Sequence, residues 1–218
     1  LICKGIDERG IPFYEDMAMQ YGLDFSGFST QALFFDYDMD GDNDMYLLNH
    51  AVHENGSFAP RLNFKETYSP LSGDRLFRND INSSSLPVEG GKVAAFTDVT
   101  KESGINSSSI GYGLGVVAAD INLDGYPDLY IGNDFHENDY LYINQRNGRF
   151  IDESEQHLMH TSKFSMGVDV ADVNNDGSPE IISMDMLPAD PYILKRSFGD
   201  DEYDIFLDKI AVGYNHQY

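Results

Sequence analysis

The feature that most constrains this chain is an acidic nine-residue pattern that occurs three times. The pattern D-x-[DN]-x-D-G-x-x-[DE] covers residues 36–44, 120–128 and 172–180, here called the first, second and third loops. Short apolar runs flank each copy, such as 32–35 before the first loop and 45–48 after it. Runs this short, rich in β-branched and aromatic residues and bounded by Gly and Asp, predict strands rather than helices. The repeated unit is therefore a strand, an acidic loop and a second strand.

Each repeat extends beyond its second strand. After the second loop, residues 139–144 and 149–152 predict two further strands joined by a turn at Asn147-Gly148. Residues 74–79 and 95–100 match these two strands after the first loop. Four antiparallel strands per unit is the architecture of a β-propeller blade. The sequence therefore predicts an all-β fold, a section of a β-propeller with incomplete blades, in which the acidic loops join the first and second strands.

The spacing of the loops sets the expected domain organisation. The first unit is longer than the second, and two polar, loop-like insertions at about 51–73 and 81–93 account for the difference. We expect one propeller section over 1–218, made of a partial blade at 1–28, blades at 29–107 and 108–162, and a partial blade at 163–218. A closed propeller needs about four to eight blades. We therefore expect the remainder of a longer chain, or partner subunits, to complete it.

A helix is expected near the C-terminal end of the sequence. Residues 200–212 place Tyr203, Phe206, Leu207 and Ile210 on one helical face, and Gly213 follows as a cap. This segment stands where the later strands of the last unit would be. We therefore interpret it as a short helical insertion in the last partial blade.

The composition of the loops indicates a hard cation. Oxygen-bearing side chains stand at loop positions one, three, five and nine, with glycine at position six, and position seven would offer its backbone carbonyl. Ca²⁺ takes six to eight oxygen ligands in flexible geometry, whereas Mg²⁺ prefers strict octahedral geometry and keeps its waters. The candidate Ca²⁺ ligands are Asp36, Asp38, Asp40, Asp42 and Asp44; Asp120, Asn122, Asp124, Tyr126 and Asp128; and Asp172, Asn174, Asp176, Ser178 and Glu180.

The loop pattern is also compatible in part with two other structures, the EF-hand and a plain acidic turn. The EF-hand shares the first half of the pattern, but it requires Glu at position twelve and a helix on each side. Position twelve is Leu47, Ile131 or Ser183, and the flanks predict strands, so the EF-hand is excluded. The loops could also be plain acidic turns, because Asp, Asn and Gly are common turn formers. Three copies in register favour calcium, and the third copy is the least regular because Glu180 replaces Asp.

The charge balance narrows the choice of partners. The chain has 14 basic and 37 acidic residues, a formal net charge of −23. Such a field repels nucleic acid and anionic membrane surfaces, so neither is an expected partner. No run of 18 apolar residues occurs, so direct membrane insertion of this segment is not expected. Cys3 is the only cysteine, which excludes an intramolecular disulfide and a cysteine-based zinc site.

The loops and their flanking strands resemble FG-GAP/VCBS repeats, which occur in integrin α-subunit propellers and many bacterial surface proteins. The chain more closely resembles bacterial VCBS-repeat proteins related to cartilage acidic protein. The segments that carry this closer resemblance are 111–115, 130–142, 164–167, 185–188 and 214–218. An elongated turn at 4–11 departs from the short turn that follows Asn144. The resemblance implies a calcium-loaded β-propeller outside the cytoplasm, and it implies no enzymatic activity that can be placed on residues.

Two classes of function follow as hypotheses. The first is a non-catalytic, calcium-binding module of a secreted or cell-surface protein, such as an outer-membrane-associated bacterial one, that binds a protein or glycan ligand on a propeller face. The second is a non-catalytic or catalytic propeller part of an extracellular hydrolase or lyase. The sequence contains no Gly-x-Ser-x-Gly, Walker or Rossmann pattern. We therefore favour the first class and predict no catalytic residue.

Overall fold

The computed structural model describes residues 1–52, 60–64, 67–81, 88–89, 92–93, 95–186, 188–193 and 203–214. Its strands are β1 (Ile2–Ile6), β2 (Pro12–Glu15), β3 (Ser29–Phe35), β4 (Asp44–Asn49), β5 (Arg75–Asn79), β6 (Val88–Glu89), β7 (Lys92–Val93), β8 (Phe96–Asp98), β9 (Gly113–Ala119), β10 (Asp128–Asn133), β11 (Tyr140–Asn144), β12 (Phe150–Asp152), β13 (Ser165–Ala171) and β14 (Glu180–Asp185). Its helices are α1 (Ala18–Tyr21), η1 (Arg61–Asn63), α2 (Thr100–Ser103), α3 (Ser154–His157) and α5 (Tyr203–Ala211).

The strands form the expected antiparallel sheets. Two sheets have four strands, in the orders β3-β4-β5-β8 and β12-β11-β10-β9, and β13 pairs with β14 as the start of a third. A separate hairpin, β1–β2, precedes the first four-stranded sheet. This confirms the prediction of an all-β fold made of four-stranded antiparallel units.

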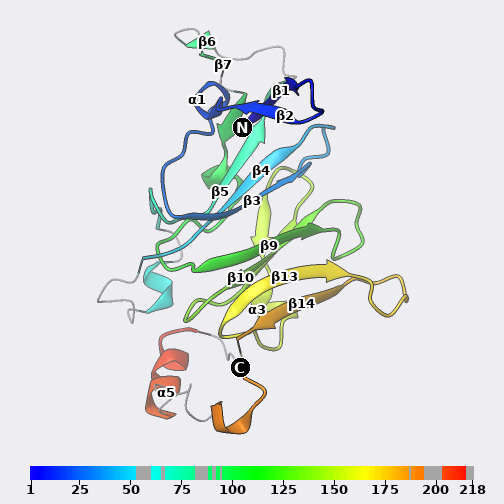
Figure 1. Cartoon of the computed structure of the whole chain (residues 1–218). Coiled ribbons are helices and arrows are strands. Elements are labelled where there is room, and N and C mark those ends of the chain that lie inside the picture. Colours follow the sequence, from blue (N-terminus) through cyan, green and yellow to red (C-terminus); the bar gives the residue numbers. More distant parts are fainter. Residues whose placement is uncertain are drawn as a thin grey trace.

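The acidic loops join the first and second strands of their units, as predicted. The last paired residues before and after each loop are Phe35 with Asp44, Ala119 with Asp128, and Ala171 with Glu180. All three loops lie at the same end of the sheets, to the right in Figure 1. The position-nine residue of each loop is thus also the first residue of the second strand.

The sheets lie beside one another in chain order (Figure 1). Strand β9 contacts β3 and β4 on one side and β13 on the other. Leu129 and Ile131 of β10 join a large core cluster with the first sheet, whereas Tyr130 joins a second cluster toward β13–β14. Successive strand residues point to opposite faces of a sheet. The inner strands β10 and β11 of the middle sheet are therefore buried on both faces.

Glycine residues allow the sheets to approach one another closely. A Cβ at Gly113 would overlap the Leu48 side chain of the first sheet. A Cβ at Gly132 would lie 2.8 Å from Val168 Cγ1 of β13. Leu48 is fully buried and Val168 is partly buried against the middle sheet, so an added methyl group would overpack both contacts. The glycines of the middle sheet are therefore packing residues on both of its faces.

The two predicted insertions differ from a plain loop. The first contains η1, whose Arg61 is buried and places Nη2 2.9 Å from Glu137 Oε1. The second contains the hairpin β6–β7. Two-residue strands carry no period-two pattern, so the sequence could not reveal this hairpin. Residues 53–59, 65–66, 82–87, 90–91 and 94 lie outside the described residues.

The expected C-terminal helix is present as α5. The backbone N–H of Arg61 donates to the carbonyl of Val212, 2.9 Å away, just after this helix. Tyr214 is buried beyond it. The first insertion and the C-terminal segment are thus bound to each other. Of the predicted helix, residues 200–202 lie outside the described residues, as do Leu187 and residues 215–218 of the segments that carry the family resemblance.

Candidate metal centres

The three acidic loops follow one backbone path. At position four, Met39, Leu123 and Asn175 have positive φ angles of 62°, 58° and 61°, and at position six Gly41, Gly125 and Gly177 have 94°, 90° and 89°. Residues other than glycine seldom adopt positive φ. No atom of the described residues lies within 4 Å of a Cβ at Gly41. The glycine is therefore required by the backbone conformation rather than by space.

The carboxylate at position one closes each loop. In the first loop, Asp36 Oδ1 accepts a hydrogen bond from the Asp40 N–H at 3.1 Å, and Asp36 Oδ2 accepts one from the Gly41 N–H at 2.9 Å. Asp120 makes the equivalent pair at 2.8 and 2.9 Å, and Asp172 at 3.1 and 2.9 Å. These bonds hold the position-one carboxylate at the centre of its loop.

Three carboxylates converge in the first loop. One oxygen each of Asp36, Asp38 and Asp40 lies within 4.8 Å of the others. Asp38 Oδ1 is buried and has no hydrogen-bond partner among the residues that the structure describes. Burial, together with the charges of Asp40 and Asp36, raises the pKa of Asp38 above its ordinary value. Converging, partly buried oxygen atoms of this kind fit a hard divalent cation.

The position-nine carboxylates of the first and second loops are fully buried at the base of those loops. Asp44 accepts hydrogen bonds from the N–H of Tyr37 at 3.1 Å and the N–H of Asn79 at 2.8 Å. Asp128 accepts one from the N–H of Asn144 at 2.8 Å. Burial raises the pKa of Asp44 to about 7. A carboxylate has about four lone-pair sites, so these bonds leave acceptor capacity for a cation.

The third loop holds its longer carboxylate in the same way. Glu180 Oε2 accepts a hydrogen bond from the N–H of Val173 at 2.8 Å. Val173 occupies the same loop position as Tyr37, whose N–H binds Asp44. Glu180 Oε1 accepts one from Asn174 Nδ2 at 2.6 Å. The Glu in place of Asp therefore preserves the contact at the base of the loop.

Asparagine at position three makes the second and third loops less charged than the first. Asn122 Oδ1 accepts a hydrogen bond from the Asp124 N–H at 3.1 Å, and its Nδ2 donates to Asp124 Oδ2 at 3.0 Å. Arg146 Nη2 also lies 3.0 Å from Asp124 Oδ2. In the described part of the chain, the first loop is the only one that brings three carboxylates together.

The residues at position seven were predicted to offer backbone carbonyls. Their N–H groups donate to the carboxylate at position five, with Asp42 3.1 Å from Asp40 Oδ1, and Tyr126 2.9 Å from Asp124 Oδ1. Ser178 repeats this bond to Asp176 Oδ1 at 2.8 Å. Position seven is therefore fixed by its backbone in all three loops, whatever its side chain.

Two asparagines at the base of the loops were not singled out from the sequence. Asn79 ends β5 and Asn144 ends β11, and each donates its N–H to a position-nine carboxylate at 2.8 Å. A signal for them does exist, because D-x-x-x-x-N recurs at 74–79 and 139–144. That recurrence aligns the third strands of the two units and places an asparagine at the end of each.

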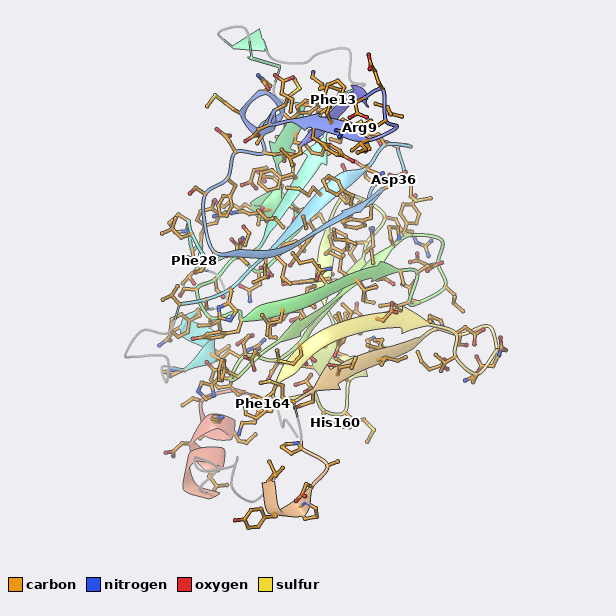
Figure 2. All side chains as sticks on the ribbon, viewed as in Figure 1. Arg9, Phe13, Phe28, Asp36, His160 and Phe164 are labelled. Carbon is orange, nitrogen blue, oxygen red and sulfur yellow. The ribbon has the colours of Figure 1, made fainter. Side chains whose placement is uncertain are left out.

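A cavity of about 370 Å³ opens near the ends of the sheets remote from the acidic loops. Phe28, Tyr112 and Tyr214 line it together with the buried carboxylate of Glu137. Figure 2 labels Phe28 on this side of the molecule and Asp36 on the other. The cavity and the acidic loops are therefore separate features.

Fold and loops together define a β-propeller-type repeat module. A sequence profile described as an FG-GAP-like repeat matches residues 120–183, which include the second and third loops. This supports the FG-GAP repeat interpretation, and such repeats are typical of extracellular proteins. No curated protein matches the chain. Among the described residues, no helix is both long and apolar enough to cross a membrane.

Proposed function

We propose that the three loops bind Ca²⁺ and that the chain is a non-catalytic β-propeller module of a secreted or cell-surface protein. The observation that carries the proposal is the convergence of Asp36, Asp38 and Asp40, together with the buried Asp38 Oδ1, which has no hydrogen-bond partner among the described residues. The same backbone path in all three loops extends the proposal to the second and third. A bound cation would offset the mutual repulsion of these carboxylates.

The chain's own residues would hold the cation in one common way. Side chains at positions one, three, five and nine would provide oxygen ligands, and the carbonyl at position seven would provide another. Bound calcium would join the start of a loop to the first residue of the next strand. Because extracellular calcium, at roughly millimolar concentration, fills sites with Kd near 10⁻⁴ M, the proposal also favours a location outside the cytoplasm.

Removing one ligand should remove part of the stabilisation by calcium. A ligand that binds only the folded state adds about 2.7 kcal/mol per site at a hundredfold excess over Kd. For a domain of this size that corresponds to about 5 °C or more in Tm. We expect Asp36→Ala to reduce the calcium-dependent rise in Tm by this amount, measured by calorimetry with calcium and with chelator.

Asp42→Ala is the matched control, because position seven is proposed to contribute only its carbonyl. It removes one carboxylate from the same loop, as Asp36→Ala does, and should leave the calcium-dependent rise in Tm nearly unchanged. If both variants lose the same part of the calcium-dependent rise in Tm, calcium binding depends on the total charge of the loop rather than on the proposed ligands. A Tm that is the same with calcium and with chelator would contradict the proposal as a whole.

We also propose that a protein or glycan ligand contacts the end of the propeller remote from the calcium loops. The cavity there combines aromatic side chains with polar ones, the mixture that ligand sites commonly show. Titration of the ¹⁵N-labelled protein with a panel of neutral oligosaccharides tests the glycan form. Shifts confined to the amides of Phe28, Leu71 and Tyr112 would support it, and shifts at the loops alone would contradict it.

A further inference from the structure

Asn144 contacts both the first and the second loop. Its side-chain Nδ2 donates to the carbonyl of Tyr37 in the first loop at 2.8 Å and to the carbonyl of Pro127 in the second at 3.1 Å. Its backbone N–H donates to Asp128 Oδ1 at 2.8 Å. Asn144 is buried, with 2% of its surface exposed. One buried residue of the middle sheet therefore bonds to backbone or ligand atoms of two loops.

On the side of the first loop, the contact reaches residues next to proposed ligands. Tyr37 directly follows Asp36, and its N–H donates to Asp44 Oδ2 at 3.1 Å. The Tyr37 ring is buried, with its centroid 6.0 Å from that of Phe150 in the middle sheet. The Tyr37 side chain is thus packed between the two sheets. A continuous series of hydrogen bonds links Asp44 to Asp128 through Tyr37 and Asn144.

We propose that Asn144 is a positioning residue that couples calcium binding in the first and second loops, so that each loop binds more tightly when the other is filled. The proposal rests on the proposed function. Calcium in the first loop would restrict the motion of the Tyr37 backbone. Through its hydrogen bonds to Tyr37 and Asp128, Asn144 would then restrict the motion of the Asp128 carboxylate. Prior ordering lowers the conformational entropy that the second binding event must remove. Such coupling is reciprocal by thermodynamic necessity.

Asn79 provides a matched control in the neighbouring sheet. Its N–H donates to Asp44 Oδ1 at 2.8 Å, and its Nδ2 donates to the carbonyl of Asn43 at 3.0 Å. Both acceptors belong to the first loop. Asn79→Ala therefore removes the same side-chain amide as Asn144→Ala, from the base of one loop only. A general weakening of the loops would appear in both variants, whereas loss of coupling would appear only at Asn144.

Each loop has its own reporter of calcium. The N–H of Gly41 donates to Asp36 Oδ2, and that of Gly125 donates to Asp120 Oδ2, both at 2.9 Å. Calcium at those carboxylates should shift the two amide resonances. One ¹⁵N-labelled sample then gives a separate midpoint for each loop, which is the calcium concentration that produces half of the shift. In the Asp36→Ala variant we expect the Gly125 midpoint to rise about fivefold, the lower end of typical coupling. Asp120→Ala should raise the Gly41 midpoint by the same factor.

The expected effect of Asn144→Ala is that the two loops become independent. In the Asn144→Ala background, a second substitution, Asp36→Ala, should leave the calcium midpoint of the Gly125 amide unchanged. In the Asn79→Ala background, the same second substitution should still raise that midpoint. If Asn144→Ala does not fold, Asn144→Asp replaces it. Aspartate lacks the donor to Tyr37 and keeps the Oδ1 that accepts the Arg146 N–H at 2.9 Å.

The outcomes separate the coupling from the proposed function. If both loops bind calcium, but the midpoint of each is unchanged by the Asp→Ala substitution in the other, the coupling is overturned and calcium binding stands. Coupling that persists in both Asn144 variants would overturn the role of Asn144. Gly41 and Gly125 amides that do not respond to calcium at all would overturn the proposed function itself. The Asp36→Ala and Asp120→Ala comparison needs no Asn144 variant, so folding of that variant does not decide the test.

Discussion

At the scale of single residues, each four-stranded sheet has a buried carboxylate just before its third strand, and this carboxylate accepts hydrogen bonds from the second strand. Asp74 accepts a hydrogen bond from the Tyr46 hydroxyl at 2.8 Å, and Asp139 accepts one from the Tyr130 hydroxyl at 2.7 Å. Each also accepts the backbone N–H of the asparagine three residues after that tyrosine, at 2.8 Å. Burial raises the pKa of Asp74 to about 7 and that of Asp139 to about 6.

These raised pKa values predict that acidification stabilises the calcium-free protein. A carboxyl with a higher pKa in the folded than in the unfolded chain gives stability that is complete below its ordinary pKa, 3.8 for Asp74. That stability is lost as the pH rises through the folded-state value. From pH 5 to pH 8 we expect Asp74 to lower the free energy of unfolding by about 2 kcal/mol. Urea unfolding in chelator at several pH values measures this change.

Asp74→Asn should remove this contribution, because an amide does not titrate. Its unfolding free energy should therefore fall less than that of the wild-type protein over the same pH range. Asp24→Asn, at an exposed position, is the control and should follow the wild-type curve. Parallel curves for Asp74→Asn and the wild-type protein would show that this carboxyl does not titrate between pH 5 and pH 8.

The sequence revealed the candidate ligands but not how they are supported. Loop composition and spacing sufficed to gather Asp36, Asp38 and Asp40, because neighbours within one loop are close in the chain. The bond between Asn144 and Tyr37 joins residues 107 positions apart. It exists only because two sheets pack at a particular distance. No local pattern encodes that distance, so the role of Asn144 could come only from the structure.

At the scale of secondary structure, the strands follow the sequence pattern closely. Residues 45–48 were predicted as a strand, and β4 runs from Asp44 to Asn49. The two extra residues are polar and fully buried, so an apolar pattern could not include them. Asp44 receives backbone hydrogen bonds, and Asn49 donates its side-chain Nδ2 to the Gly73 carbonyl at 2.6 Å. Satisfied polar groups thus extend strands beyond their apolar centres.

The close contact between the middle sheet and β13 makes a prediction about Gly132. An added methyl group would meet Val168 Cγ1 at 2.8 Å, and overpacking of this kind costs about 1–3 kcal/mol. We expect Gly132→Ala to lower the free energy of unfolding by that amount in denaturant titrations. Gly167→Ala in β13 is the control, because in the described part of the chain no atom lies within 4 Å of its Cβ position.

Adding Val168→Ala tests the assigned cause. If the clash is responsible, the double variant should lose less stability than the sum of the two single variants, because the atom that obstructs Gly132→Ala is gone. Additive losses, or equal losses from Gly132→Ala and Gly167→Ala, would mean that the glycine serves the strand backbone rather than the contact between sheets.

At the scale of the whole molecule, the outer sheets expose apolar side chains. Phe34 of β3 is 54% exposed, and Ile182 and Met184 of β14 are 43% and 67% exposed on one face. Exposed apolar faces beside a partly paired sheet favour association. We expect residues 1–218, expressed alone, to self-associate as concentration rises, measured by size-exclusion chromatography with light scattering.

Lysine substitutions locate the association surface. Ile182→Lys with Met184→Lys should shift the population toward monomer. Met159→Lys, at an isolated side chain that is 97% exposed, should not. A monomer at every concentration would contradict the expectation, and association that survives the double substitution would place the contact on another surface.

The sandwiched position of the middle sheet also has a consequence for how the molecule comes apart. Loss of either flanking sheet would uncover one of the two apolar clusters that hold β10, so we expect the sheets to depend on one another for stability. In such a stack, the free energy of unfolding is approximately the sum of an intrinsic term for each sheet and an interface term for each pair of neighbouring sheets. We therefore expect the interior amides to exchange with solvent after an outer sheet has opened, and the two-stranded β13–β14 sheet, with its exposed side chains, to open first.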